Sequence, residues 1–302
     1  MVVKQPASPE KSSDILLEIQ QARDYFKAEQ NLLSPPIARA AYSDRMAWIL
    51  ASMAHLAYDR FEKSELALRL FIAKLEGGGF ELLKVFNSKE TDTQAFLAKS
   101  SDGYAVLAFR GTELTKREDV LIDAEATRVS VLEGRVHSGF RIAYQSVADE
   151  IEASVLSLEK IPLYITGHSL GAALATIATQ GLEHNPRIRQ NIAACYTFGS
   201  PRVGNSQYDI EFKSPIYRVV NTTDIVTVIP LVAMGYIHIG DVRFLGRKDG
   251  EFRRGISVLG RSYLFLLALF KFFGPIVGDH AILEYRRKLE AIAQKRNPRF
   301  GH

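Results

Sequence analysis

The chain has 302 residues, of which 47% are apolar and 24% are charged, enough to bury the core of one large α/β domain. Its one cysteine, Cys195, cannot form an internal disulfide, and no Cys/His cluster has the spacing of a zinc site. The formal net charge of +4 is uneven, because residues 241–302 hold 13 lysines and arginines against 6 acids. This composition excludes a disulfide-stapled or zinc-stabilised module, and neither a metal nor a cofactor is expected.

Residues 1–14 contain two prolines and two lysines and lack an apolar stretch of seven residues. We therefore expect a disordered tail rather than a secretory signal, and a cytoplasmic chain. Apolar residues then recur at helical spacing over 15–30 and 38–61, which predicts two helices on one side of the domain. Residues 15–302 are expected to form this single domain.

Short apolar runs separated by polar turns follow at 80–86, 93–98 and 104–109, and they predict strands that pair antiparallel. Beyond them helices alternate with strands, which is typical of a parallel sheet with helical crossovers. Helices are predicted over 139–158 and 170–182. Strands are predicted at 163–165, 193–198 and 216–220. The fold class is therefore α/β, with a central, mostly parallel sheet flanked by helices.

Ser169 lies in Gly-His-Ser-Leu-Gly at 167–171, between a predicted strand and a predicted helix. A sharp strand-to-helix turn strains its central residue and leaves room only for glycine on either side. Such a turn presents the serine hydroxyl as a nucleophile. The N–H of the next residue, Leu170, then points toward an oxyanion on the substrate.

Serine needs a base, and the base needs an acid that orients it. In hydrolases built on this turn the order along the chain is serine, acid, histidine. Asp224 is the best acid, because it follows the predicted strand 216–220 and parallel strands assemble sites at their carboxyl ends. The alternative is that Asp224 only caps a turn.

Four histidines follow Ser169 along the chain: His184, His238, His280 and His302. Chain order excludes the first, and the last lies at the terminus. The third follows Gly-Asp at a loop-to-helix junction, where catalytic side chains are common. The second lies in the alternating run 236–240, which is typical of a strand. His280 is therefore the predicted base, and His238 the alternative.

A second oxyanion donor should follow an earlier strand, and Phe-Arg-Gly-Thr at 109–112 ends one. The backbone N–H and hydroxyl of Thr112 are the candidates. Arg110 is expected to tie strand ends together. His137 precedes the serine, so we expect it to cap or pack beside the site.

Taken together, these segments resemble the class 3 lipase family, which includes filamentous-fungal triacylglycerol lipases. The matching blocks, in order, lie at 109–112, 136–140, 165–171, 197–205, 220–226 and 279–280. The resemblance implies an α/β-hydrolase fold and Ser169, Asp224 and His280 as a catalytic triad. It also implies Thr112 and Leu170 as the oxyanion hole, and hydrolysis of acyl esters, often of water-insoluble lipids, without a cofactor.

Two segments depart from the secreted fungal members. Where those have a short apolar lid, residues 113–119 are strongly charged. Residues 262–277 are apolar except for Lys271, and they are too short and too interrupted to span a membrane. Because this run ends near His280, we expect a flap or interfacial segment at about 256–278, with an ordinary core helix as the alternative.

The sequence therefore predicts a serine ester hydrolase that cleaves acyl esters of lipids, with triacylglycerol as the expected substrate. Two alternatives stay open: a phospholipid or galactolipid acyl hydrolase or acyltransferase with the same triad, and a non-catalytic membrane-binding protein on a hydrolase scaffold. The expected partners are a lipid or ester substrate and a peripheral membrane or lipid-droplet surface, to which the basic C-terminal region could be attracted. Nucleic acid is not expected.

Overall fold

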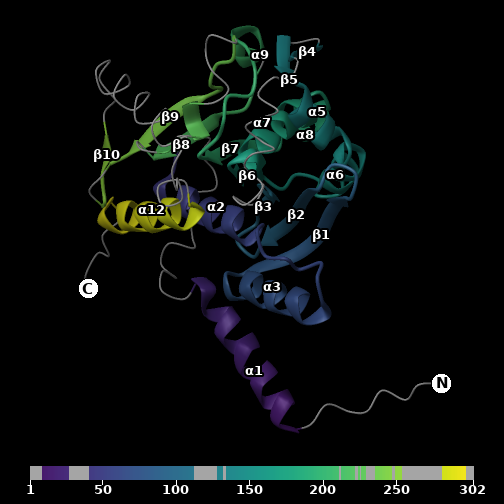
Figure 1. Ribbon diagram of the computed structural model, residues 1–302, viewed down its shortest axis with the longest axis vertical. Coiled ribbons are helices and arrows are strands. Elements are labelled where there is room, and N and C mark those ends of the chain that lie inside the picture. The colour runs from purple at the N-terminus through teal and green to yellow at the C-terminus, as the bar shows by residue number, and fades with distance from the viewer. Residues whose placement is uncertain are drawn as a thin grey trace, which may run out of the picture.

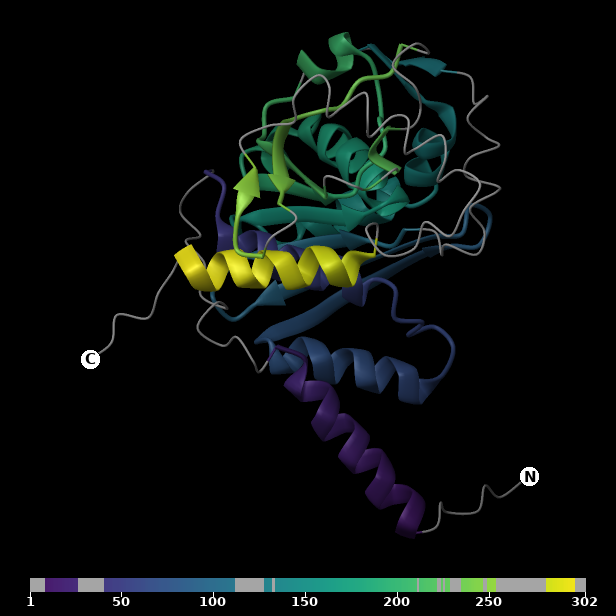
Figure 2. The ribbon, with the colours of Figure 1, turned by 60° about the vertical axis from the view of Figure 1, so that its left-hand side comes forward.

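A central eight-stranded sheet lies between two layers of helices in the computed structural model (Figures 1 and 2). The structure describes residues 9–26, 41–111, 128–131, 134–210, 212–221, 224, 226–228, 235–246, 249–253 and 281–296. The strand order is β1-β2-β3-β6-β7-β8-β9-β10. The strands are β1 Phe80–Ser88, β2 Thr93–Ser100, β3 Ala105–Phe109, β6 Leu163–His168, β7 Ile192–Phe198, β8 Ile216–Asn221, β9 Asp241–Leu245 and β10 Phe252–Arg253.

The sheet begins antiparallel and continues parallel. Strands β1, β2 and β3 pair antiparallel, as predicted, and β3, β6, β7, β8 and β9 then pair parallel. β10 closes the far edge antiparallel to β9. A separate two-stranded sheet pairs β4 (Arg128–Val131) with β5 (Gly134–His137). The carboxyl ends of β3, β6, β7 and β8 therefore lie at one edge, which is where the predicted site residues follow.

Alternate residues of the central strands enter two separate cores. Phe96, Val106 and Tyr164 belong to one core, and Leu97, Leu107 and Ile165 to the other. Helices α2 (Asp44–Leu56), α3 (Glu65–Gly77) and α12 (Ile282–Arg296) cover the first. The second is covered by α5 (Ser138–Gln145), α6 (Ala148–Leu156), α7 (Leu170–Glu183) and α8 (Pro186–Arg189). Covering both faces explains why these strands are apolar throughout rather than alternating.

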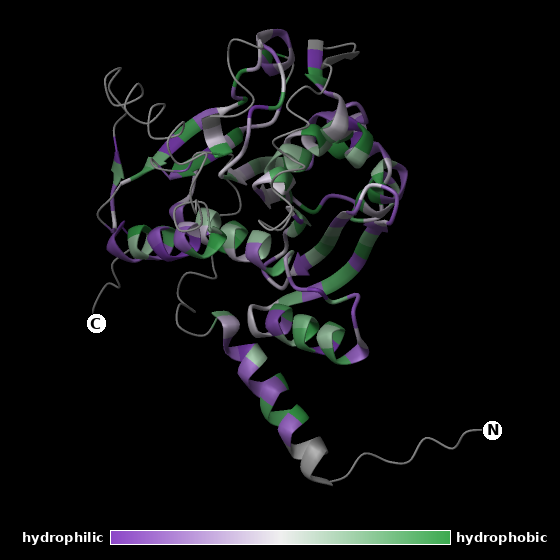
Figure 3. Ribbon diagram, viewed as in Figure 1, coloured by the Kyte–Doolittle hydropathy of each residue, from purple (hydrophilic) through white to green (hydrophobic). Residues whose placement is uncertain are grey.

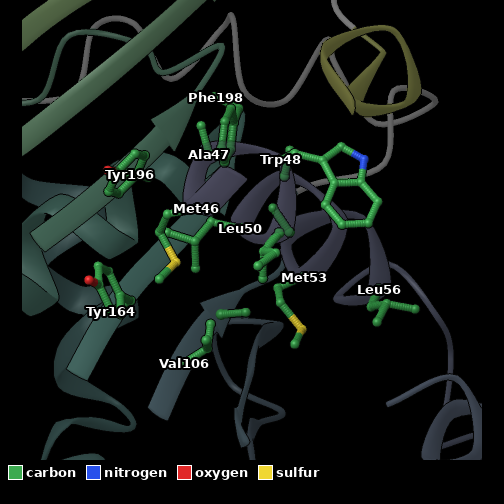
Figure 4. Close-up of a cluster of buried hydrophobic side chains, with 14 of the residues drawn as sticks. Met46, Ala47, Trp48, Leu50, Met53, Leu56, Val106, Tyr164, Tyr196 and Phe198 are labelled. Atoms are coloured by element: carbon green, nitrogen blue, oxygen red, sulfur yellow. The ribbon is translucent and has the colours of Figure 1, made fainter. Parts of the chain in front are cut away.

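Helix α2 is the centre of the first core (Figure 4). It begins at the N-cap Ser43, whose side chain accepts a hydrogen bond from the Met46 N–H, and ten of its residues are buried. Figure 4 shows Met46 and Leu50 among side chains of the sheet that include Val106 and Tyr196. α12 packs on the other side of α2, and hydrophilic and hydrophobic residues alternate along it (Figure 3). α2 is apolar nearly all round because it lies between the sheet and α12.

Helix α1 (Pro9–Arg23) projects from the body in both views and packs against α3 (Figures 1 and 2). Its C-terminal end is fixed by the Arg23–Glu76 ion pair at 3.0 Å and by the fully buried Phe26 just beyond it. The helix begins inside the segment predicted to be a disordered tail. That boundary is therefore corrected from residue 15 to Pro9, while residues 1–8 lie outside the described residues.

Two other predictions need correction, and one helix was missed. The helix predicted over 139–158 is two helices, α5 and α6, because the backbone leaves helical geometry at Val147, with φ −130° and ψ 0°. The strand predicted over 236–240 is only an isolated bridge from Ile237 to Gly204, and β9 starts after Gly240, which has φ +87°. Helix α3, capped by Ser64, was not predicted.

Candidate active site

Ser169 occupies a strained turn between β6 and α7. Its backbone has φ +57° and ψ −127°, a conformation that costs a non-glycine residue about 1–3 kcal/mol. Two hydrogen bonds hold the turn: the Ser169 N–H donates to the Phe198 carbonyl at 3.0 Å, and the Ala172 N–H donates to the Ser169 carbonyl at 3.0 Å. The residue is partly exposed. The hydroxyl is thus carried at the carboxyl edge of the sheet, as a nucleophile elbow requires.

Close backbone packing explains both glycines of the motif. A Cβ at Gly167 would overlap the Gly171 carbonyl, and one at Gly171 would lie 2.8 Å from the Arg110 carbonyl carbon. Gly111, at the end of β3, also lies against the turn, because a Cβ there would lie 2.5 Å from the His168 carbonyl oxygen. The turn therefore packs directly on the segment that leads to Thr112.

The structure describes one of the two predicted oxyanion-hole donors, Leu170. Leu170 is the first residue of α7, and its N–H has no hydrogen-bond partner among the described residues. A free N–H at a helix start is suited to a developing negative charge. Thr112 lies outside the described residues, so its part in the hole stays a prediction.

Asp224 lies just beyond β8 and is 4% exposed. Its Oδ1 accepts the Val226 N–H at 2.9 Å, and its Oδ2 accepts the Tyr285 hydroxyl at 2.6 Å. Its own N–H donates to the Asn221 carbonyl at 3.0 Å. The carboxylate thus caps a turn, as the structural alternative predicted. It is also buried and held by a side-chain hydroxyl, which a turn cap alone does not need.

Tyr285 of α12 connects the two ends of this site. Its ring centroid lies 5.9 Å from that of His168, the neighbour of Ser169, and its hydroxyl contacts Asp224. Sequence reasoning missed this residue. The spacing of Ile282, Tyr285, Leu289 and Ile292 predicts a buried helix face, but no local pattern indicates that the tyrosine meets an acid from β8.

Tyr58, which follows α2, is a second contact that the sequence did not reveal. Its hydroxyl lies 2.8 Å from Nδ1 of His168, a residue that is only 4% exposed. The hydroxyl therefore holds the residue before the nucleophile, and it lies against Gly111 together with the His168 carbonyl.

Of the four candidate histidines, the structure describes two, His184 and His238. His280 lies outside the described residues, two positions before α12 begins. His238 is not in a strand; burial, and next Arg218 and Arg202, lower its pKa to about 2, so it is neutral. His184 is exposed at the C-terminal end of α7, the end opposite Ser169. His302 lies outside the described residues.

The two flanking predictions have mixed outcomes. Arg110 is buried and bonds to Gln94 and, at 3.0 Å, to Asp92, so its role in tying strand ends is confirmed. His137 stacks on Phe140 with ring centroids 4.1 Å apart, which confirms packing. It is the N-cap residue of α5, but its side chain makes no capping hydrogen bond.

The basic residues of α12 are engaged with the protein itself. Arg287 pairs with Asp249, Lys295 with Glu251 and Arg296 with Asp44, and Arg286 stacks 4.2 Å from the Tyr25 ring centroid. Such exposed pairs are weak, yet they reduce the charge that a membrane would meet.

The charged residues 113–119 and the apolar segment 256–278 both lie outside the described residues. The flap predicted at 256–278 therefore stays a prediction. No helix within the described ranges has the length and apolar character to cross a membrane.

Part of the chain matches a known protein family. Residues 106–234 match the model of the family described as Lipase (class 3). The chain is 31% identical over 183 residues to a lipase of Rhizomucor miehei, covering 57% of this chain and 50% of that one. It is 30% identical over 161 residues to secreted mono- and diacylglycerol lipase A of Penicillium cyclopium, covering 51% and 52%. It spans about half the length of the curated relatives it matches.

Solved structures agree on the fold. Lipase II of Rhizopus niveus superposes with a TM-score of 0.59 at 21% identity, covering 92% of this chain and 97% of that one. The predicted α/β-hydrolase fold is thereby confirmed. Residues 106–234 and the fold are thus similar to those of the class 3 lipases.

Proposed function

We propose that this chain is a serine ester hydrolase that cleaves acyl esters of lipids, triacylglycerol among them, through an acyl-enzyme on Ser169. The observation that carries the proposal is the strained turn at φ +57°, because strain at a serine between a buried strand and a helix serves to expose its hydroxyl. The relatives named lipases support the same reaction.

Asp224 supports the proposal from the neighbouring strand end. β6 and β8 are separated by β7 alone, so at about 4.8 Å per strand their carboxyl ends lie roughly 10 Å apart. An imidazole fits between a nucleophile and an acid at that separation. The proposed base is His280, which precedes α12, the helix that contacts both Asp224 and His168.

The proposed reaction has two halves. His280 takes the Ser169 proton as the hydroxyl oxygen attacks the acyl carbonyl, and the Leu170 and Thr112 donors stabilise the oxyanion. The protonated imidazole then gives its proton to the leaving alcohol. Water, deprotonated by the same histidine, releases the carboxylic acid from Ser169. Asp224 holds the imidazole in one orientation throughout.

The natural setting of this reaction is also part of the proposal. A lipid substrate implies contact with a lipid surface, which the apolar segment 256–278 would make. Several relatives are described as secreted, so we propose no compartment for this chain, and the expected cytoplasmic location gains no support from them.

The test compares wild type, Ser169→Ala and Ser157→Ala on a soluble ester and on emulsified triacylglycerol, phospholipid and galactolipid. Ser157 carries an exposed hydroxyl that bonds to the Ser154 carbonyl at 2.6 Å, so it controls for the substitution itself. We expect Ser169→Ala to lose several orders of magnitude in kcat and Ser157→Ala to lose none. Failure of a fluorophosphonate to label Ser169 in the wild type would instead favour a non-catalytic scaffold.

The lipid panel separates the remaining functions. Preference for phospholipid or galactolipid would replace triacylglycerol as the substrate while keeping the triad. Transfer of the acyl group to an added alcohol faster than to water would indicate an acyltransferase.

A further inference from the structure

We infer that Tyr285 is a positioning residue of the active site, whose hydroxyl holds the Asp224 carboxylate in place. This inference rests on the proposed function. It assigns to α12 a part in the reaction that neither the chain order of the triad nor the family motifs indicate.

The hydroxyl is fixed from both sides. It accepts the Asn221 backbone N–H at 3.0 Å and donates its own proton to Asp224 Oδ2 at 2.6 Å. Because its single proton is directed by this pair of contacts, the hydroxyl has one orientation. Tyr285 is fully buried, so water cannot replace it. A short hydrogen bond donated to a carboxylate is among the stronger ones in proteins, so it holds the carboxylate in one position.

The donor keeps its proton under all working conditions. Burial, and next the Asp224 carboxylate, hold the pKa of Tyr285 well above its ordinary value. The charged and titratable groups around the pair come from three elements. They are Arg218 on β8, Lys288 and Glu284 on α12, and His168 on β6.

The same helix fixes the strand end that carries the acid. Lys288, one turn beyond Tyr285, is buried and donates to Asn221 Oδ1 at 3.0 Å. Asn221 in turn accepts the Asp224 N–H. α12 therefore contacts the Asp224 loop through two side chains, and it begins two residues after His280. The same helix, α12, therefore both holds Asp224 and follows closely after His280, the proposed base.

The test compares Tyr285→Phe with Tyr196→Phe. The Tyr196 hydroxyl is also buried and also accepts a backbone N–H, that of Ser43 at 3.0 Å, but it donates no hydrogen bond to a carboxylate among the described residues. Both variants therefore lose a buried hydroxyl and leave one N–H unpaired. Only Tyr285→Phe removes a donor from Asp224.

For Tyr285→Phe we expect kcat on a soluble ester to fall on the order of tenfold to a hundredfold with KM unchanged, the loss typical of a displaced catalytic group. The acid limb of the kcat/KM profile should move to higher pH, because a carboxylate with fewer donors stabilises an imidazolium more strongly. Tyr196→Phe should keep the wild-type profile. Equal pH profiles for the two variants would overturn the inference, because a loss of packing or stability alone does not shift the acid limb of the kcat/KM profile.

A second variant serves if Tyr285→Phe does not fold. Replacing Tyr285 with 3-fluorotyrosine keeps the packing and strengthens the donor, so the acid limb should move to lower pH. An unmoved limb would reject the inference. Wild type and Ser169→Ala are assayed alongside. An inactive wild type would reject the proposed function itself. An active wild type whose position 285 variants keep the wild-type pH profile would reject only the role of Tyr285.

Discussion

Gly171→Ala tests whether the close contact between α7 and β3 sets the position of the nucleophile. The added Cβ would lie 2.8 Å from the Arg110 carbonyl carbon and nearer still to the Phe109 carbonyl oxygen. Ordinary contacts at a Cβ begin at 3.4 Å, so the start of α7 must move from β3 by at least 0.6 Å. Both obstacles are backbone atoms, and no side-chain rotation can relieve them.

This displacement acts directly on Ser169 and on the Leu170 N–H. We expect kcat to fall on the order of tenfold to a hundredfold, and the free energy of unfolding to fall by about 1–3 kcal/mol, the cost of overpacking. The assay is hydrolysis of a soluble ester, with stability followed by urea unfolding.

Gly181→Ala is the matched control in the same helix. There the added Cβ would lie 2.8 Å from Cε1 of the Tyr144 side chain, which can rotate, and the site is distant from Ser169. We expect this variant to keep the wild-type kcat. A Gly171→Ala protein with wild-type kcat would refute the reasoning.

Two further predictions concern stability. Burial, and next Arg286, lower the pKa of His55 to about 4. Between pH 6.5 and 4 the unfolded chain therefore binds a proton that the folded chain does not. The free energy of unfolding should fall as the pH falls through this window. His55→Gln, which can still bond to the Tyr25 hydroxyl, should flatten the dependence of the unfolding free energy on pH between 7 and 4; an unchanged slope would contradict this assignment. Trp48→Ala should cost about 3–5 kcal/mol in thermal or urea unfolding, because Trp48 is 1% exposed and its indole also bonds to Glu290 of α12 at 3.3 Å. A loss below 1 kcal/mol would mean that α12 does not depend on this contact.

The sequence predicted the parts of the fold that local patterns control. The alternation of strands and helices, the antiparallel start and the elbow at Ser169 follow from periodicity and from the two glycines. The strand at 236–240 failed because alternation was counted without the left-handed turn at Gly240. The long helix at 139–158 failed because the backbone leaves helical geometry at Val147, and a hydropathy pattern does not contain that information.

Chain order and the place after a parallel strand select Asp224 as the predicted acid. Its contact with Tyr285 could not be predicted in this way, because it joins residues 61 positions apart. The contact of Tyr58 with His168 joins residues 110 positions apart. Such pairs depend on how α2 and α12 dock on the sheet, and that docking is a property of the assembled core.

The contacts of α12 with Asp224 and Asn221, made by Tyr285 and Lys288, matter for the order of events during synthesis on the ribosome. β6, the elbow and β8 leave the exit tunnel before residues 282–296 are made, so the early strands can pair while the acid still lacks its tyrosine. A nascent chain would therefore carry an exposed serine without a competent partner. In the proposed mechanism, activity would therefore appear only after residues 282–296 are made and α12 docks against α2 and Asp224.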